Sequence, residues 1–372
     1  MNSCPSIDAD DEGILALARP EIRALKPYAS ARALASSAGI LLNANENPWP
    51  PTGDDGLELN RYPDPQPSDL RDELATRYAV NSDEILITRG SDEGIDLLIR
   101  TFCRAGVDRV MICPPCFGMY GLSARVQGAE VIEVPLLDQG DQWNLDYEAI
   151  CAERPVRLMF LCSPNNPTGH EIKSEMVEAL CQRQRGHGLV IVDEAYIEFS
   201  TSDSMTDMIE RYPNLVVLRT LSKAYALAGC RIGALISRPA VVNLLRRIIA
   251  PYPLPTPSVA AARRALAEPA RFDQQLAALH AEKDRLIEAL SSLSSIVRLW
   301  PGQANFVLIR VDDADALIEA AAQAGIRLRN QSAQPGLENC VRITIGNSEE
   351  TSALIDFFQN QFSASEMNQE GR

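Results

Sequence analysis

The sequence predicts an α/β protein with a mostly parallel central sheet and helices on both faces, followed by a smaller α/β unit. From Glu84 onward, short apolar runs alternate with helical patterns. Several of these runs are continuously apolar, which is typical of strands in a sheet that is covered on both faces. Strand, helix and strand at this spacing form crossover units, so we expect most strands to run parallel.

The strand candidates are short and rich in branched apolar residues. In chain order they are Glu84–Thr88, Arg109–Cys113, Glu130–Val134, Val156–Cys162, Leu189–Asp193, Leu215–Thr220 and Arg231–Ser237. A helix is expected over Ser91–Cys103, because its apolar residues recur at the spacing of one helical face. A second helix is expected over Ser174–Arg185 for the same reason.

A proline-rich segment separates the two predicted units. Ala250–Pro257 contains four prolines, and such a run fits neither a helix nor a central strand. It is followed by a long helical stretch with an interruption near Pro269 and then by alternating strands and helices: Ser258–Leu293, Asn305–Val311, Ala314–Ala324, Val341–Ile345 and Glu349–Phe362.

These patterns divide the chain into three parts. We predict an N-terminal arm over residues 1–45, a large domain over 46–257 and a small C-terminal domain over 258–372. The first 13 residues or so are expected to be mobile, because their acidic side chains repel one another and little there can be buried.

Charge and composition limit the possible functions. The chain has 372 residues, of which 46% are hydrophobic and 23% charged, and a formal net charge of −15. We therefore expect no binding to nucleic acid or to membranes. The acidic start lacks the apolar core of a signal peptide, and nine cysteines, an odd number, fit reduced thiols. A cytoplasmic protein is expected, in which any anionic substrate needs a locally basic pocket.

Four polar segments directly follow predicted strands: Arg89–Gly94, Ser163–Gly169, Asp193–Tyr196 and Thr220–Gly233. Each alone has an ordinary interpretation as a helix start, a turn, a helix N-cap or a surface loop. Together they are more informative, because the carboxyl ends of parallel strands are where open α/β sheets bind ligands.

The chemistry of these segments centres on Lys223. Burial beside a strand disfavours the charged ammonium and lowers its pKa, which frees the amine to form a Schiff base. Asp193 can pair with a ring cation, and Tyr196 can donate to a ring oxygen. Cys113 and Cys116 form a C-x-x-C pair, but two prolines separate them and no second pair exists, so no metal is predicted.

The motifs resemble those of fold-type-I pyridoxal-phosphate enzymes, and within them those of the histidinol-phosphate aminotransferase family. The lysine segment and Pro164-Asn-Asn-Pro-Thr-Gly169 indicate the superfamily. Arg61-Tyr-Pro63, Asp193–Phe199 and Ala250-Pro-Tyr-Pro253 indicate the family. The resemblance covers about residues 20–360. It implies transamination between L-histidinol phosphate and 2-oxoglutarate in histidine biosynthesis, giving imidazole-acetol phosphate and L-glutamate, with pyridoxal 5'-phosphate as cofactor.

The resemblance also implies the cofactor contacts. Lys223 would bind the cofactor covalently and then move a proton, Asp193 would pair with the pyridinium nitrogen, and Tyr196 and Asn166 would bind the ring 3-oxygen. The other contacts would be Ser91, Asp92, Ser222 and Arg231 at the phosphate, Phe117 stacked on the ring where the family often has tyrosine, and Tyr62 from the other subunit of a homodimer.

On the substrate side, the resemblance assigns the glutamate carboxylate to Arg342 and the phosphate of histidinol phosphate to Arg329 and Arg342 together. Tyr28 and Asn45 would line the same pocket from the N-terminal arm. The two arginines would supply the basic pocket, although both could equally be exposed residues on strands of the small domain.

Three alternatives stay open at this point. A threonine-phosphate decarboxylase-like lyase shares the fold and a phosphorylated amine ligand. An aromatic-amino-acid aminotransferase would use the same cleft with weaker phosphate contacts. A cofactor-binding regulator without catalysis is disfavoured by the complete set of Lys223, Asp193, Tyr196, Asn166 and Arg231.

Overall fold

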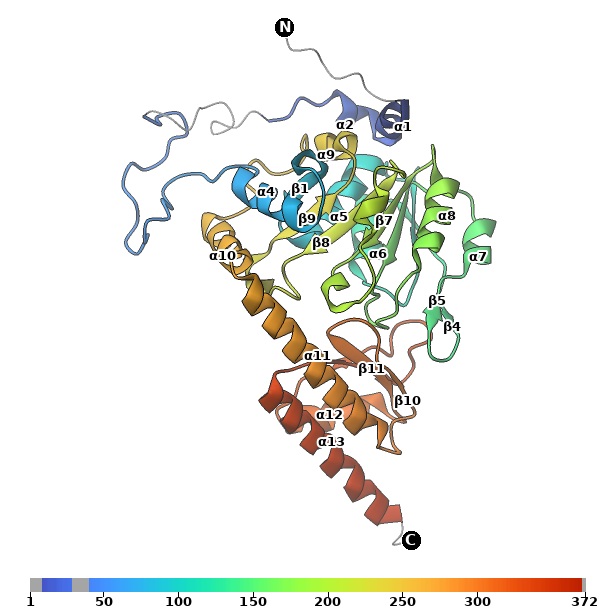
Figure 1. The fold of residues 1–372 in the computed structure, drawn as a ribbon. Coiled ribbons are helices and arrows are strands. Elements are labelled where there is room, and N and C mark those ends of the chain that lie inside the picture. The colour runs from blue at the N-terminus through green and yellow to red at the C-terminus, as the bar shows by residue number, and fades with distance from the viewer. Residues whose placement is uncertain (1–8, 29–39, 370–372) are drawn as a thin grey trace.

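The computed structural model describes the backbone of residues 9–28 and 40–369, and the side chains of residues 10–28 and 40–361. The strands of its large sheet are β1 (Ile85–Thr88), β2 (Arg109–Ile112), β3 (Glu130–Glu133), β6 (Leu158–Cys162), β7 (Leu189–Asp193), β8 (Leu215–Thr220) and β9 (Gly233–Ile236). Their spatial order is β1-β9-β8-β7-β6-β2-β3 (Figure 1). The strand β9 runs opposite to the other six strands of this sheet. The predicted α/β class with a mostly parallel sheet is therefore confirmed.

Most predicted strands end within two residues of the observed bounds, and β7 and β8 have the predicted bounds. The prediction of a strand over Arg231–Ser237 is wrong at its start. Arg231 has a left-handed φ of +55° after a 3-10 turn at Ala228–Cys230, so β9 begins only at Gly233. Arg231 therefore lies outside β9, and its side chain contacts Ser222 and Asp92.

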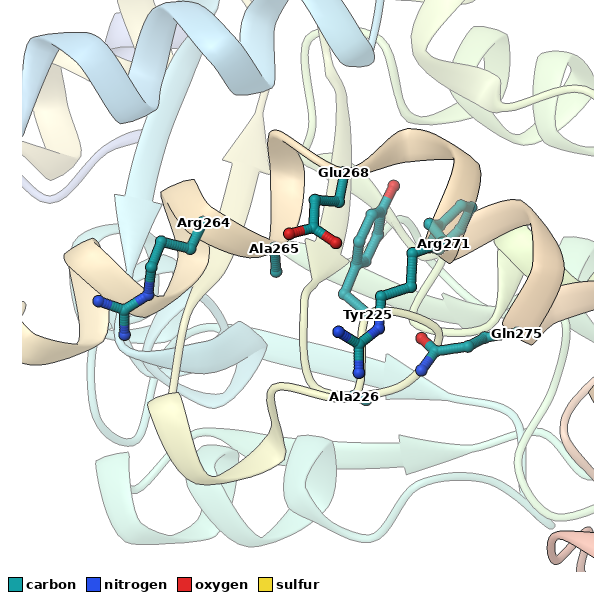
Figure 2. Close-up of a pocket in the computed structure, with 8 residues that line it drawn as sticks. Tyr225, Ala226, Arg264, Ala265, Glu268, Arg271 and Gln275 are labelled. Atoms are coloured by element: carbon teal, nitrogen blue, oxygen red, sulfur yellow. The ribbon is translucent and has the colours of Figure 1, made fainter.

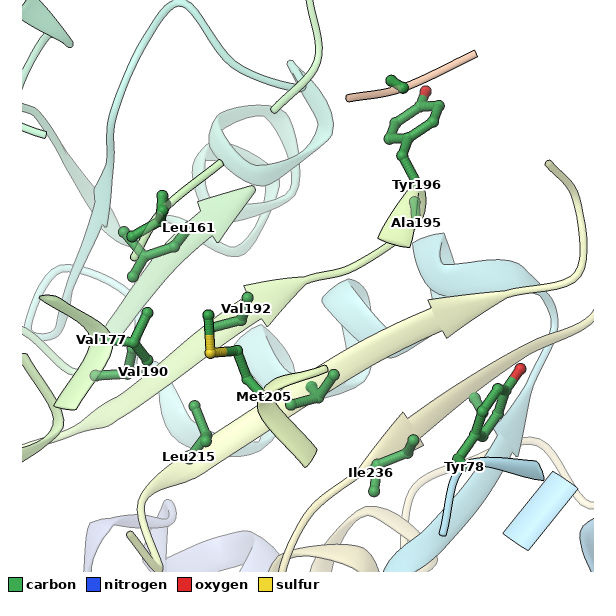
Figure 3. Packing of buried hydrophobic residues seen from close by; sticks show 14 of the residues in the cluster. Tyr78, Leu161, Val177, Val190, Val192, Ala195, Tyr196, Met205, Leu215 and Ile236 are labelled. Atoms are coloured by element: carbon green, nitrogen blue, oxygen red, sulfur yellow. The ribbon is translucent and has the colours of Figure 1, made fainter. Parts of the chain in front are cut away.

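Helices cover both faces of the large sheet. One face carries α1 (Ala9–Leu17), α5 (Gly90–Phe102), α6 (Met119–Gln127) and α9 (Pro239–Leu245), and the other carries α4 (Ser68–Arg77), α7 (Tyr147–Ala152), α8 (Ser174–Gln184) and α10 (Thr256–Leu266). Each face has its own core: the first lies under α1, α5, α6 and α9, and the second under α4, α7, α8 and α10. Successive strand residues point to opposite faces, so Ile191 joins the first core and Val190 and Val192 join the second. Figure 3 shows part of the second core, with Tyr196 at its upper end.

The N-terminal segment corrects one expectation. Residues 1–8 lie outside the described part, but Ala9–Gly13 belong to α1, so the predicted mobile start does not extend to residue 13. Asp10 and Asp11 pair with Arg185 and Arg238 instead of repelling one another. A short helix, α2 (Pro20–Ala24), follows α1.

The small unit has its own sheet and core. Its strands are β10 (Arg298–Trp300), β11 (Phe306–Arg310), β12 (Arg329–Asn330) and β13 (Cys340–Thr344), in the antiparallel order β10-β11-β13-β12. The helices α11 (Pro269–Ser291), α12 (Ala314–Gln323) and α13 (Ser348–Gln369) pack on it. The strands β10 and β12 were not predicted, because two or three residues show no recognisable period.

The position of the domain boundary at residue 257 stays a prediction. The helix α10 contacts α4 of the large unit, and its Ala262 and Leu266 join the core there. The long helix α11 then runs down to the small sheet (Figure 1). Pro269 therefore starts a second helix, where its missing N–H costs nothing. A two-stranded ribbon, β4 (Leu137–Asp138) and β5 (Trp143–Asn144), contacts the small sheet, where Asp138 pairs with Arg298 of β10.

The two units meet through backbone atoms next to the Ser163–Gly169 turn that follows β6. Gln303 N–H donates to the Gly169 carbonyl at 2.6 Å, and a Cβ on Gly302 would lie 2.6 Å from Gly169 Cα. Lys283 on α11 donates to the carbonyls of Gly302 and Ala304 at 2.7 and 2.9 Å. Lys283 therefore holds the Gly302–Ala304 loop against the large unit.

None of the helices in the described residues has the length and apolar character needed to cross a membrane.

Candidate active site

A cavity of about 640 Å³ lies at the carboxyl end of the large sheet and is closed on one side by the small sheet. It collects residues from many separate segments of the chain. The predicted site residues that line it are Ser91, Asp92, Phe117, Asn166, Asp193, Tyr196, Ser222, Lys223, Arg231, Arg329 and Arg342. The expectation that these segments converge at one edge is therefore met by the fold.

Asp193 is the last residue of β7 and is only 3% exposed. Its Oδ1 accepts the N–H of Ala195 at 3.1 Å, and its Oδ2 accepts the hydroxyl of Tyr120 at 2.6 Å. Burial raises the pKa of this carboxyl to about 6, against the lowering effect of these hydrogen bonds and of Lys223. A cationic ring nitrogen in the cavity would hold the carboxylate in its charged form.

Lys223 follows β8 and lines the cavity, and it is exposed there rather than buried as expected from the sequence. Its Nζ lies 5.5 Å from the centre of the Tyr196 ring. Desolvation by the cavity walls lowers the pKa of the ammonium, and the charge of Arg342 lowers it further. Both effects favour the neutral amine, which is the nucleophilic form.

Hydrogen-bond donors gather around Arg231 at the N-terminus of α5; we call this group the anion cup because its donors suit an anion. Arg231 donates to Ser222 Oγ at 3.3 Å and to the carboxylate of Asp92 at 3.1 Å. A Cβ on Gly90, which has a φ of +73°, would lie 2.6 Å from Arg231 Nη2. Glycine at this position therefore lets the guanidinium lie against the helix terminus, where free N–H groups favour a phosphate.

Two arginines of the small sheet face the same cavity. Arg329 on β12 is the direct cross-strand partner of Arg342 on β13, so both side chains lie on one face. The Arg342 guanidinium lies 5.3 Å from the Phe306 ring and contacts Asn166 Oδ1. The Arg342 Nε is buried without a hydrogen-bond partner. Such a pair suits a doubly charged anion.

Three predicted residues do not line the cavity of their own chain. Tyr28 is 75% exposed, Asn45 is also exposed, and Tyr62 is 47% exposed and stacks on Tyr252 with ring centres 4.4 Å apart. In Figure 1 the segment before α4 extends away from the body of the molecule. The predicted roles of these three residues therefore stay predictions.

Sequence reasoning missed Tyr120, Gln331 and Gln334. Gln334 Oε1 accepts the N–H of Cys116 at 2.9 Å, and its amide donates to Gln331, so this pair joins the small unit to the loop that carries Phe117. The spacing of Phe117 and Tyr120 fits one helical face, but the same spacing is typical of ordinary core residues. Their roles depend on contacts between segments far apart in the sequence.

A second cavity, of about 350 Å³, lies next to Tyr225 and Ala226 (Figure 2). It is lined by Tyr225, Ala226, Arg264 of α10, Arg271 of α11 and Glu268 between the two helices. Glu268 balances part of the arginine charge, and none of the residues assigned to chemistry lines it. Across the described side chains, no cluster of three or more His, Cys, Asp or Glu is arranged to hold a metal.

The donor set of the first cavity suits a flat aromatic cation that carries a phosphate. The anion cup, the buried carboxylate and the amine of Lys223 lie around one space, with Phe117 and Tyr196 as its aromatic walls. The two arginines leave room for a second, anionic molecule beside it.

Comparisons with known proteins agree with this chemistry. The family model "Aminotransferase class I and II" matches residues 40–358. A histidinol-phosphate aminotransferase of Xylella fastidiosa is 46% identical to the chain, over 92% of this chain and 95% of the relative. One of Idiomarina loihiensis is also 46% identical, over 93% of this chain and 98% of the relative.

Two solved structures show the same architecture. The histidinol-phosphate aminotransferase of Clostridium acetobutylicum has a TM-score of 0.75 at 24% identity, over 82% of this chain and 92% of that chain. The histidinol-phosphate aminotransferase of Sinorhizobium meliloti, in complex with pyridoxal-5'-phosphate, has a TM-score of 0.73 at 26% identity. The match covers 80% of this chain and 81% of that chain.

The raised pKa of Asp193 predicts a pH dependence of stability in the ligand-free protein. Between about pH 4 and pH 6 the folded state keeps a proton that the unfolded state releases, so the contribution of Asp193 is greatest below pH 4 and is lost as pH rises to 6. Two pH units correspond to about 3 kcal/mol. Asp193→Asn should therefore gain up to that amount relative to the parent protein from pH 4 to pH 7.

Urea unfolding across this pH range measures the difference. Asp141→Asn, at an exposed position, is the control and should follow the parent. Parallel curves for Asp193→Asn and the parent would show that this carboxyl is not desolvated.

Proposed function

The chain belongs to the class I and II aminotransferase family, and we propose that it transfers the amino group of L-histidinol phosphate to 2-oxoglutarate with pyridoxal 5'-phosphate as cofactor. The products are imidazole-acetol phosphate and L-glutamate, which places the enzyme in histidine biosynthesis. The observation that carries the choice of substrate is the Arg329–Arg342 pair, which faces the cavity that also holds Lys223.

The cofactor, when bound, supplies an electron sink that stabilises negative charge on the substrate carbon. Around it, Asp193 keeps the ring nitrogen protonated, and Tyr196 and Asn166 hydrogen-bond the ring 3-oxygen. The cup of Ser91, Asp92, Ser222 and Arg231 binds the phosphate and fixes the orientation of the ring. Lys223 would hold the cofactor through its amine and, when free, would accept and return the proton at the substrate carbon.

The two small-sheet arginines bind the anionic end of either substrate. A carboxylate takes a bidentate contact with Arg342, whereas a phosphate with nearly two charges engages Arg342 and Arg329 together. One cavity can therefore accept histidinol phosphate and glutamate in turn. The lowered pKa of Lys223 fits this arrangement, because the charge of Arg342 favours the neutral amine.

We propose further that the enzyme is a homodimer in which Tyr62 reaches the phosphate cup of the other subunit. The segment that carries Tyr62 exposes Ile40, Leu42 and Trp49 at 90%, 87% and 75%, far more apolar surface than an isolated chain needs. Its conformation is nevertheless fixed, because Glu46 accepts the Tyr62 N–H at 2.7 Å and pairs with Arg61. A second copy of the chain covers this segment, and Tyr28 and Asn45 approach the substrate in the same way.

A cytoplasmic location completes the proposal. Cys113, Cys116 and Cys162 are free and buried around one small cavity, and free thiols in such proximity fit a reducing compartment.

A half-reaction screen tests the function. The cofactor-loaded enzyme is mixed separately with histidinol phosphate, histidinol, phenylalanine and threonine phosphate, and conversion to the pyridoxamine form is followed by absorbance. We expect histidinol phosphate to convert it fastest, and Lys223→Ala to lose conversion while it stays folded. Faster conversion by phenylalanine would favour an aromatic aminotransferase, and release of CO₂ from threonine phosphate would favour a lyase.

Arg329→Ala should weaken the reaction of histidinol phosphate much more than that of glutamate. Arg329 is exposed at the edge of the cavity, so the loss of its charge-assisted contact costs about 1–2 kcal/mol, or roughly 5- to 30-fold in kcat/KM. Arg342→Ala should impair both half-reactions. Single-turnover kinetics with each substrate measures the two effects, and equal small losses for Arg329→Ala would remove the phosphate role of this arginine.

The shared site predicts complementation between inactive subunits. Lys223→Ala and Tyr62→Phe subunits, mixed under conditions in which subunits exchange, should form heterodimers with one site that is intact at both positions. Activity above the sum of the separate variants is expected. A mixture that never exceeds this sum, although mass spectrometry detects heterodimers, would exclude the action of Tyr62 across the interface.

A further inference from the structure

We propose that Tyr120 is a positioning residue for Asp193: its buried hydroxyl holds the carboxylate in its ionised form and in a fixed orientation toward the cavity. The consequence for cofactor binding rests on the proposed function, whereas the interaction itself belongs to the protein alone. The experiment below separates the two.

The contact is direct and buried. The Tyr120 hydroxyl donates to Asp193 Oδ2 at 2.6 Å, and its side chain is 0% exposed. The other oxygen, Oδ1, accepts the N–H of Ala195. One donor on each oxygen fixes the plane of the carboxylate, and the remaining lone pairs stay available to a partner in the cavity.

The tyrosine ring is itself held on two sides. It stacks on Phe160 of β6 with ring centres 5.0 Å apart and an angle of 8° between the planes. Phe117 meets it edge-on at 5.6 Å and 83°. The helix α6 that carries Tyr120 packs on α5 and β2. The hydroxyl is therefore delivered by a rigid part of the core, as a residue that orients another must be.

The charge balance around Asp193 explains why such a donor is needed. Burial favours the neutral acid, the carboxylate of Asp92 acts in the same direction, and Lys223 and the Tyr120 hydroxyl act in the opposite direction. Cys162 and Tyr196 also interact electrostatically with Asp193, and burial raises the pKa of both. Burial likewise raises the pKa of Tyr120 well above its ordinary value, so it remains a neutral donor throughout the physiological range.

Tyr120→Phe removes the hydroxyl and keeps the ring between Phe160 and Phe117. In the ligand-free protein, the pH range over which Asp193 affects the urea midpoint should move up by about one pH unit, because the charged form loses a donor. In the Asp193→Asn background the same substitution should leave the pH dependence unchanged. Tyr212→Phe, at another buried tyrosine whose hydroxyl contacts Gln182, is the matched control.

Pyridoxal 5'-phosphate binding to the same variants gives the second readout. Tyr120→Phe should weaken the affinity about fivefold at pH 6 and less than twofold at pH 8, as expected for a one-unit shift of the carboxyl. This loss should vanish in the Asp193→Asn background.

Two outcomes would overturn the proposal. An equal loss of affinity at both pH values, with an unchanged pH dependence of unfolding, would assign Tyr120 a purely structural role. Full effects of Tyr120→Phe in the Asp193→Asn background would show that it does not act through Asp193. If the pH dependence of unfolding shifts as expected but no variant binds the cofactor, the interaction stands and the proposed function fails.

Discussion

Burial of one carboxylate, Asp193, is the constraint on which the arrangement of the site depends. A charged group at the end of a covered strand costs free energy unless donors and cations surround it. Here these come from separate segments: the hydroxyl of Tyr120, the N–H of Ala195 and the positive charge of Lys223. The strands that bring them together must keep their order, so the chemistry of the site and the topology of the sheet cannot vary independently.

The sequence was sufficient for the features that depend on local pattern. The alternation of apolar runs and helical periods predicted the sheet, and the polar motifs after strands predicted four segments that meet at the cavity. Phe117, Arg329 and Arg342 were predicted only from the resemblance to the family. It failed where a contact joins distant segments. The pattern of residues does not indicate that Arg231 adopts a left-handed backbone conformation. Nor does it indicate that Asp10 forms an ion pair with Arg185 or that the Tyr120 hydroxyl contacts Asp193. Very short strands such as β12 could not be predicted for the same reason, because only their pairing with a neighbouring strand defines them.

The contact between the two units has an unusual requirement. Gly169 and Gly302 approach so closely that neither position has room for a side chain, and Gly302 adopts a φ of +55°. Gly169 ends the turn that carries Asn166, and the loop at Gly302 is bonded to Lys283 of the long helix α11. Burial lowers the pKa of Lys283 to about 8, but its two carbonyl partners keep it in place. Hydrogen bonds thus join α11, through the loop at Gly302, to the turn that carries Asn166.

The arginines of the cavity lie in a molecule whose net charge is −15, so a dianionic substrate meets two opposing fields. At low ionic strength the field of the whole molecule extends tens of ångströms and repels the substrate before it reaches the opening. At physiological ionic strength the screening length is about 8 Å, and the approaching anion interacts mainly with Arg329 and Arg342. Added salt therefore has opposite effects on the two steps of binding: it speeds the encounter and weakens the final ion pairs.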